Sequence, residues 1–362
     1  MKVGIITLHS VANYGTQLQA FATQEKLKQY FDEVEFIDYR RSNTYGKELL
    51  NTFTNGNPIK TIIIKPTLNK WRKVFGNFQK EYLNIGKEVY LDNSDFDKFN
   101  DKYDIYFSGS DQVWNTGWNN GIIPPLYLSF VPDNKPKYAY ASSFGKTKLE
   151  ENEIEDCKKY LQRFDKISVR EESGLKILSE QIGIDDSIRI LDPTLVMDKE
   201  FWKKYEPKNK IDGDYILIYN LNRSKEFDDY AKKLAKKTGY KIYRFCTRYD
   251  QLLRNGKSLL IPEILDFVTL VDNAKIVLTD SFHATAFSFN MNTEPICIYP
   301  QNYSSRLSDF LKLVDSEQRH AVDYNDFDVI NRHVDFDKVN SILEKEREKV
   351  NKFLEEIVKE NS

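Results

Sequence analysis

The strongest constraint on the fold is an alternation of short apolar runs with longer stretches of helical periodicity. An apolar run at 2–7 is followed by residues 17–30, where Leu18, Phe21 and Leu27 lie near helical spacing. Further strands are predicted at 34–38, 105–107, 138–141 and 166–169, with a charged helix around 148–163. This order is typical of a parallel sheet with helices on both faces.

A polar stretch that begins near 191–194 separates this region from a second one. The second region predicts strands at 215–219, 241–245 and 276–278, and helices around 224–237 and 261–271. Residues 336–359 carry apolar side chains on roughly one helical face. Because 362 residues suggest two domains, we predict two α/β domains, 1–195 and 196–330, each with its own parallel sheet. An amphipathic helix within 331–362 should pack back on them.

Composition excludes several classes of function. The balance of 53 basic against 55 acidic residues argues against a protein built to hold nucleic acid. Three widely spaced cysteines indicate a reducing compartment and give no metal-ligand spacing. No signal peptide and no membrane-spanning run is apparent, so a cytoplasmic location is expected. The sequence contains no P-loop and no nucleophile elbow, and we expect no metal and no cofactor.

Residues 49–80 differ from their surroundings because they contain six Lys or Arg and no Asp or Glu. Trp71, Phe75 and Phe78 are interleaved with these charges, and Pro58 and Pro66 are expected to break any long helix. The segment predicts an insertion in the first domain, at about 49–90, rather than part of its sheet.

His283 is the strongest candidate for chemistry. Residues 276–278 predict a buried strand, Ser281 a cap, and 284–289 the start of a helix. Ligands of open α/β sheets bind at such carboxyl edges, and helix N-termini there attract anions. A histidine in this place can bind phosphate or move a proton near neutral pH. The alternative is a histidine with a structural role.

Two other turns carry polar residues. His9, Asn13 and Tyr14 follow the first strand, and Gly15 and Thr16 lead into the next helix. A second set of residues follows the strand at 105–107 and has the chemistry to hold sugar hydroxyls: Ser110, Asp111 and Gln112. Both turns could equally be capped turns without a ligand.

Arg170 ends the predicted strand at 166–169, and its planar fork matches phosphate or carboxylate. The alternative is that Arg170 pairs with Glu171, Glu172 or another acidic residue.

Six motifs in order make the chain resemble the polysaccharide pyruvyl transferase family across residues 1–312. They are TLHSVANYGTQLQA (7–20), GSDQVWN (109–115), ASSFG (141–145), SVRE (168–171), LDPT (191–194) and TDSFH (279–283). The resemblance implies a GT-B-like fold with the ligand cleft between two Rossmann-like domains. It also implies transfer of the enolpyruvyl group of phosphoenolpyruvate (PEP) to a sugar, commonly galactose, as a ketal. The first domain would hold the acceptor and the second would hold PEP.

The resemblance assigns roles residue by residue. The family's histidine corresponds to His283 and its anion-binding arginine to Arg170, whereas Ser281-Phe282 replaces an Arg-Leu pair of some members. Arg306 and Arg223 are candidates to replace that arginine. PEP would thus meet Arg170, Ser281, His283, Arg306 and Arg223. The acceptor would meet His9, Asn13, Tyr14, Ser110, Asp111 and Gln112. His283 and Arg170 would be the catalytic residues: His283 as the general acid–base group, and Arg170, with Arg306, holding the phosphate and carboxylate. Glu263 and Asp280 remain alternative proton carriers.

Acceptors in this family are often lipid-linked at the inner membrane face. Peripheral membrane contact through Lys60–Lys80 is therefore one hypothesis, with Trp71, Phe75 and Phe78 at the interface. A helical insertion that covers the sheet or the acceptor cleft is the other. Two further functions stay open on the same fold: a glycosyltransferase that uses a sugar nucleotide, and a non-catalytic carbohydrate-binding relative. The sequence does not indicate the acceptor sugar or the oligomeric state.

Overall fold

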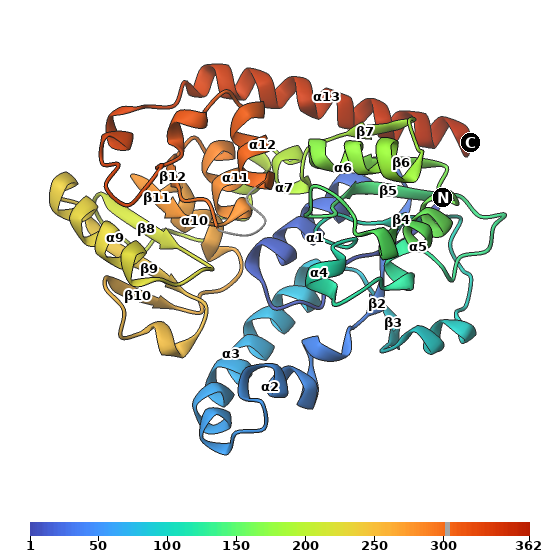
Figure 1. The fold of residues 1–362 in the computed structure, drawn as a ribbon, viewed down its shortest axis with the longest axis horizontal. Helices are drawn as coiled ribbons and strands as arrows, with labels where there is room; N and C mark the ends of the chain where they lie inside the picture. Colours follow the sequence, from blue (N-terminus) through green and yellow to red (C-terminus); the bar gives the residue numbers. More distant parts are fainter. Residues whose placement is uncertain (301–304) are drawn as a thin grey trace. The chain divides into compact units, whose positions relative to one another are not determined.

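The computed structural model describes residues 1–300 and 305–362, which form two compact units (Figure 1). Unit 1 comprises residues 1–62, 77–196 and 346–362, and unit 2 comprises residues 63–76 and 197–345. The chain passes from unit 1 to unit 2 between Ile62 and Ile63 and again between Val196 and Met197, and it returns to unit 1 at Asn77 and at Glu346. Residues 63–76 group with unit 2, although the sequence had suggested that the whole of 49–90 belongs to the first domain.

Unit 1 is built on a seven-stranded parallel sheet with strand order β3-β2-β1-β4-β5-β6-β7. Its strands are β1 (Lys2–Ile6), β2 (Glu33–Tyr39), β3 (Ile85–Tyr90), β4 (Ile105–Ser108), β5 (Lys137–Ser142), β6 (Lys166–Val169) and β7 (Ser187–Arg189). Its helices include α1 (Tyr14–Leu27), α4 (Thr116–Asn119), α5 (Glu151–Leu161), α6 (Glu172–Lys176) and α7 (Pro193–Val196). Val3 pairs with Ile105 at the centre, and both are buried, as expected where helices cover both faces of a parallel sheet.

Unit 2 has a five-stranded parallel sheet of order β10-β9-β8-β11-β12. The strands are β8 (Tyr215–Tyr219), β9 (Lys241–Cys246), β10 (Lys257–Leu260), β11 (Ile276–Thr279) and β12 (Glu294–Cys297). The helices include α8 (Lys199–Lys203), α9 (Lys225–Thr238), α10 (Asp266–Asp272), α11 (Phe282–Asn290) and α12 (Ser305–Leu313). Phe227 and Leu234 of α9 pack against Ile216 and Ile218 of β8 in the core. The predicted fold class, two α/β units with parallel sheets, is confirmed.

Most of the segment at 49–90 is helical, and its helix is not interrupted at Pro66. Helix α2 (Gly46–Thr54) precedes α3 (Pro58–Tyr82), which continues through Pro66. Asn57 caps α3 by accepting the N–H groups of Ile59 and Lys60, and Pro58 occupies its first turn, where its missing N–H costs nothing. The expectation that Pro66 breaks a helix was therefore wrong, whereas Pro58 lies where α2 has ended and α3 begins. The insertion also ends before residue 90, because β3 is an edge strand of the sheet.

The aromatic side chains of α3 contact other parts of the fold. Phe75 and Phe78 are 5% and 4% exposed, and Phe78 packs edge-on to Phe21 of α1. The Trp71 indole N–H donates to the carbonyl of Thr247 at 2.7 Å, within unit 2. Phe75 and Phe78 therefore cannot form the membrane interface proposed for them, because their apolar area is already covered by the fold.

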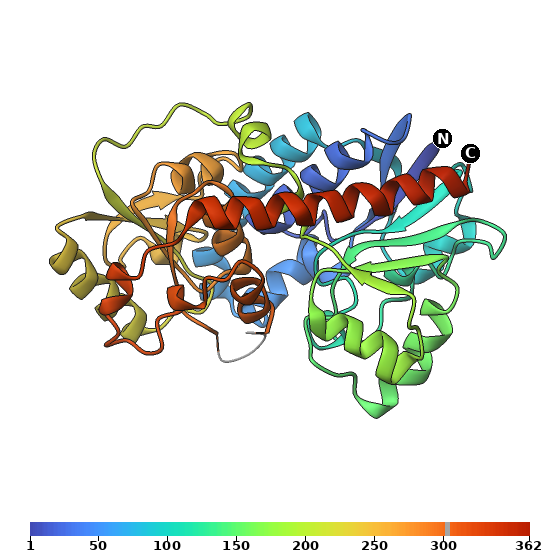
Figure 2. The ribbon, with the colours of Figure 1, turned by 90° about the horizontal axis from the view of Figure 1, so that it is seen from above.

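The chain ends in α13 (Phe336–Glu360), one continuous helix in Figure 2. Leu343, Leu354 and Ile357 are fully buried, in agreement with the apolar face seen in the sequence. Within unit 1, Glu346 accepts from Arg189 at 2.7 Å. In the described parts of the chain, no helix combines the length and the apolarity that a bilayer crossing needs.

Candidate functional site

The strand-to-helix turn of unit 2 is fixed by a chain of hydrogen bonds. The Thr279 hydroxyl, at the carboxyl end of β11, donates to the Tyr219 carbonyl at 2.6 Å. It also accepts the Ser281 N–H at 3.0 Å, and the Ser281 side chain caps α11 by accepting the Ala284 N–H. This arrangement places His283 in the first turn of α11, at the carboxyl edge of the sheet, where anions bind readily.

His283 and Arg306 contact the same aromatic ring. The His283 side chain is largely buried, and its ring lies edge-on to Phe282 with centroids 5.4 Å apart. The Arg306 guanidinium of α12 lies 5.8 Å from the Phe282 ring centroid, close enough for a cation–π contact. Some members of the family that the sequence resembles have an Arg-Leu pair where this chain has Ser281-Phe282. The structure therefore places the guanidinium of Arg306, from another helix, beside this turn. Ser304, two residues before Arg306 in the sequence, lies outside the described residues.

Asp280 ties this turn to the loop after β8. Its two carboxylate oxygens accept the N–H groups of Leu221 and Asn222, each at 2.7 Å. Burial raises the pKa of Asp280, and these hydrogen bonds oppose the rise in part. Because both oxygens are used on the backbone, the geometry gives Asp280 a positioning role. Glu263, the other alternative proton carrier, is exposed in the loop before α10.

Arg223 belongs to an arginine cluster that sequence reasoning recognised only in part. Arg223 lies 3.4 Å from Asp250, and Arg248 holds the same carboxylate through two hydrogen bonds of 3.0 Å. Burial lowers the pKa of Arg223; Asp250 opposes this shift, and Arg248 and Arg254 add to it. The sequence signal that we missed is that Arg248 follows β9, the neighbour of β8, so both arginines follow the same sheet edge.

Arg170 lies in unit 1 and is enclosed by carboxylates. Its guanidinium is 1% exposed and contacts Asp192 at 2.5 Å, Asp111 at 3.1 Å and Glu171 at 3.7 Å. Although burial lowers the pKa of Arg170, the three carboxylates outweigh it and raise the value. Three negative charges around one positive charge leave an unfavourable field for a further anion. The sequence left open whether Arg170 binds an anion or pairs with acidic residues, and the structure shows the pairing with acidic residues.

The predicted acceptor residues Asn13, Ser110, Asp111 and Gln112 surround the ends of β1 and β4, which are adjacent strands. Asn13 caps α1 by accepting the Thr16 N–H, and the Thr16 hydroxyl donates to Asp111 at 2.7 Å. Asp111 adopts a left-handed backbone with φ of 73°, which its hydrogen bonds must hold in place.

The remaining members of this set differ in exposure. Ser110 is fully buried, and its carbonyl accepts from Thr7. Tyr14, the first residue of α1, is 1% exposed. Gln112 is half-buried and accepts from Asn115. Of this set, the half-buried Asn13 and Gln112 are therefore more accessible to solvent than Ser110, Asp111 and Tyr14.

His9 is a core residue. Its ring is 1% exposed, stacks on Phe36 and lies 3.2 Å from a carboxylate oxygen of Asp38. Its carbonyl accepts from the side chains of Gln17 and Gln79. The prediction that the His9 side chain meets the acceptor does not fit this burial, because the ring has no route to a sugar in this conformation.

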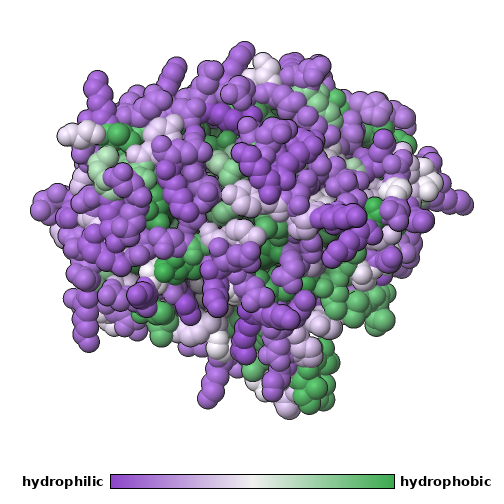
Figure 3. Space-filling view, turned by 180° about the vertical axis from the view of Figure 1, so that it is seen from behind, coloured by the Kyte–Doolittle hydropathy of each residue, from purple (hydrophilic) through white to green (hydrophobic). Residues whose placement is uncertain are grey.

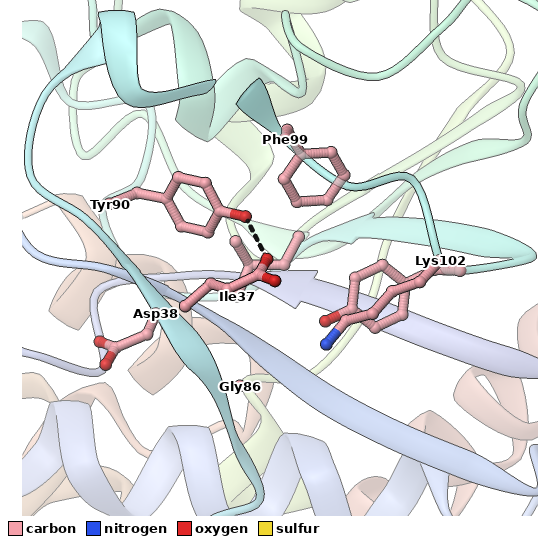
Figure 4. Close-up of a pocket in the computed structure, with 8 residues that line it drawn as sticks. Ile37, Asp38, Gly86, Tyr90, Phe99 and Lys102 are labelled. Carbon is pink, nitrogen blue, oxygen red and sulfur yellow. Dashed lines mark hydrogen bonds between the residues drawn. The ribbon is translucent and has the colours of Figure 1, made fainter. Parts of the chain in front are cut away.

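A small pocket opens at another part of unit 1, beside β2 and β3 (Figure 4). Tyr90 donates to Glu88 at 2.9 Å on its wall, and Phe99 and Lys102 also line it. Its cavity volume of about 10 Å³ is far below the roughly 300–1,000 Å³ of typical ligand sites. It contains none of the predicted site residues and is not a candidate for the donor.

Comparison with solved structures shows the fold. UDP-GlcNAc 2-epimerase from Neisseria meningitidis, bound to UDP-GlcNAc, is similar with a TM-score of 0.50 and 13% identity, covering 96% of this chain and 94% of that chain. Os79 from O. sativa, in complex with UDP and deoxynivalenol-3-glucoside, has a TM-score of 0.52 and 8% identity over the full length of both. These similarities identify the GT-B fold, as the sequence resemblance implied.

No curated protein sequence matches the chain. The sequence profile of one family, polysaccharide pyruvyl transferase, matches residues 13–302, most of the chain. The site motifs discussed above lie within or overlap this span. The chain therefore belongs to the polysaccharide pyruvyl transferase family, a family of transferase enzymes.

Proposed function

We propose that this protein transfers the enolpyruvyl group of PEP to a galactose-like sugar of a cell-surface polysaccharide, such as an exopolysaccharide or capsule, or of its lipid-linked precursor. The product is a pyruvate ketal, and phosphate is released. The observation that carries the proposal is the position of His283 in the first turn of α11, with Arg306 beside the same Phe282 ring. Together they combine a proton carrier, a cation and a helix N-terminus.

The proposed donor site lies in unit 2. PEP is a trianion near neutral pH and needs fixed positive charge. Arg306 supplies such a charge beside Phe282. Arg223 supplies a second one, and the charge of Arg248 acts on Arg223. Ser281 contributes the cap that sets the direction of α11. The proposal needs neither a metal nor a cofactor, because arginines can stabilise the charge of the departing phosphate.

The proposed chemistry starts with protonation of the PEP methylene carbon, for which His283 is the proton donor. The resulting cationic carbon accepts one sugar hydroxyl, which loses its proton. The C–O bond to phosphate then breaks, and a second hydroxyl closes the ketal with loss of its own proton. One of the two hydroxyl protons replaces the proton consumed at carbon, and the other leaves with phosphate as HPO₄²⁻, so atoms and charge balance.

The proposed acceptor side is the polar edge of unit 1. The burial of Arg170 supports a positioning role in place of direct contact with PEP: it fixes Asp111, whose left-handed backbone begins the turn that carries Gln112. We place the reaction in the cytoplasm, because Cys157, Cys246 and Cys297 are all free and buried.

The test is phosphate release from PEP in the presence of galactose-containing acceptors. His283→Ala should lower turnover by about 10²–10⁴-fold, the usual contribution of a general acid–base group. His333→Ala is the matched control, because its side chain is 74% exposed and its ring lies 3.3 Å from Glu294 at the surface. Turnover of His283→Ala close to wild type would contradict the assignment of His283, and no release with any acceptor would contradict the reaction.

A further inference from the structure

The first turns of α3 carry three exposed isoleucines. Ile59, Ile62 and Ile63 are 68%, 74% and 60% exposed. Their spacing of i, i+3 and i+4 places them together on one face of the helix. The buried side chains Ile64 and Leu68 lie on a different face, so the isoleucines are not a continuation of the packed core. Hydrophobic side chains also gather at the lower edge of Figure 3, where the α2–α3 segment lies.

The charge around these isoleucines has one sign. Lys60 and Lys65 flank them and are both exposed. Residues 49–80 contain no Asp or Glu, and the nearest acidic residues in sequence are Glu48 and Glu81. An apolar helix face flanked by lysines, in a segment whose sequence contains no Asp or Glu, is the pattern of a helix that lies in a lipid–water interface.

A second apolar pair extends from a loop that is bonded to the same helix. Within unit 2, the Thr67 hydroxyl accepts the Tyr249 N–H at 3.1 Å, so the loop after β9 is held on α3. Leu252 and Leu253, three and four residues further on, are 44% and 98% exposed. Leu252 and Leu253 are therefore a second exposed apolar pair within unit 2.

We infer that the start of α3 is a contact site for an anionic lipid surface, with Ile59, Ile62 and Ile63 inserted among the acyl chains and Lys60 and Lys65 at the headgroups. The contact differs from the one suggested by the sequence, because isoleucines rather than the buried aromatic side chains enter the interface. Charge complementarity selects a lipid surface as the partner: exposed lysines on either side of an apolar helix face, Lys60 and Lys65, match anionic headgroups above hydrocarbon. The inference stands independently of the proposed reaction.

The experiment is flotation of the full chain with vesicles of phosphatidylglycerol and phosphatidylcholine, and with vesicles of phosphatidylcholine alone. We expect binding to the anionic vesicles only. Lys60→Gln with Lys65→Gln should weaken partitioning about 30-fold, which is about 2 kcal/mol at 1.4 kcal/mol per factor of ten. The matched control is Lys233→Gln with Lys236→Gln, which removes the same charge from exposed positions of α9 and should bind as wild type.

A triple variant tests the apolar part: Ile59→Ser, Ile62→Ser and Ile63→Ser should weaken binding at least tenfold. Val322→Ser, at a 76% exposed valine elsewhere, should not change it. Circular dichroism and the melting temperature show whether the variants remain folded. Wild-type flotation equal to that of the triple variant, or no flotation at all, would overturn the inference. A second contradicting result would be a wild-type protein that elutes as a dimer on gel filtration and a triple variant that elutes as a monomer. The isoleucines would then bind a second copy of the chain.

Discussion

Replacing Arg170 by methionine should destabilise unit 1 severely, because three carboxylates would lose their common cation. Asp192, Asp111 and Glu171 converge on this guanidinium, and it is almost fully buried. Methionine fills a similar volume without charge. Breaking a buried ion pair by removing one partner costs about 3–5 kcal/mol, and here the loss leaves more than one carboxylate without compensation.

The expected change in melting temperature follows from the size of the unit. For domains of 150–250 residues, 1 kcal/mol shifts the midpoint by about 2–4 °C, so Arg170→Met should lower it by roughly 6–20 °C. Differential scanning calorimetry is the suitable assay, because a chain with two units need not unfold in one step. Lys28→Met is the control: its pair with Glu25 is partly exposed and should contribute less than about 1 kcal/mol.

A double variant separates charge from packing. Adding Asp192→Asn to Arg170→Met removes the carboxylate at 2.5 Å, so the double variant should be more stable than Arg170→Met by about 0.5–3 kcal/mol. A melting temperature of Arg170→Met within about 2 °C of wild type, together with loss of the response to PEP, would refute the reasoning. Arg170 would then be a direct ligand of the donor.

Two further predictions concern the helix α3 and the buried pair at the sheet. Pro66→Ala should stabilise the protein by about 1–3 kcal/mol in urea unfolding, because it restores a helical N–H inside α3; a destabilised variant would mean that the proline is required there. Burial raises the pKa of Asp38, but hydrogen bonds from His9 and Arg40 outweigh it, so the pKa lies below its usual value. Its contribution to stability should be present above pH about 3.9 and disappear as the pH falls through the lowered pKa. Asp38→Asn should therefore flatten the acid limb of a pH–stability curve, and an unchanged limb would contradict the pairing.

The central strands were predictable from sequence, whereas the edge strands were not. β1, β4, β8 and β11 are covered on both faces, so they appear as short continuous apolar runs. The four strands that sequence analysis did not predict, β3, β7, β10 and β12, are the edges of the two sheets. Apart from β12, which contains Pro295, they are only partly buried, and β3 carries Lys87 and Glu88 on exposed positions. A pattern search for apolar runs has little signal at such edges.

The candidate site shows a similar division. The turn at 279–283 was predictable because a buried run, cap residues and a helix start adjoin in sequence. The partners of Arg170 were not, because Asp111 and Asp192 come from the ends of other strands and meet it only in the folded unit. The helix through Pro66 was not predictable for the same reason, because it depends on contacts in the folded chain. Burial of Ile64 and Leu68 offsets the unfavourable helix propensity of proline, which the sequence analysis took as decisive.

The most direct test of the account is thermal unfolding of the purified protein with PEP and, in parallel, with UDP and UDP-sugars. A ligand at about 100 times its dissociation constant stabilises the native state by about 2.7 kcal/mol, which is roughly 5–11 °C for a unit of this size. The account predicts a rise with PEP that is reduced in Arg306→Gln and kept in His333→Ala, and none with the nucleotides. A rise with UDP or a UDP-sugar and none with PEP would contradict it and favour a glycosyltransferase.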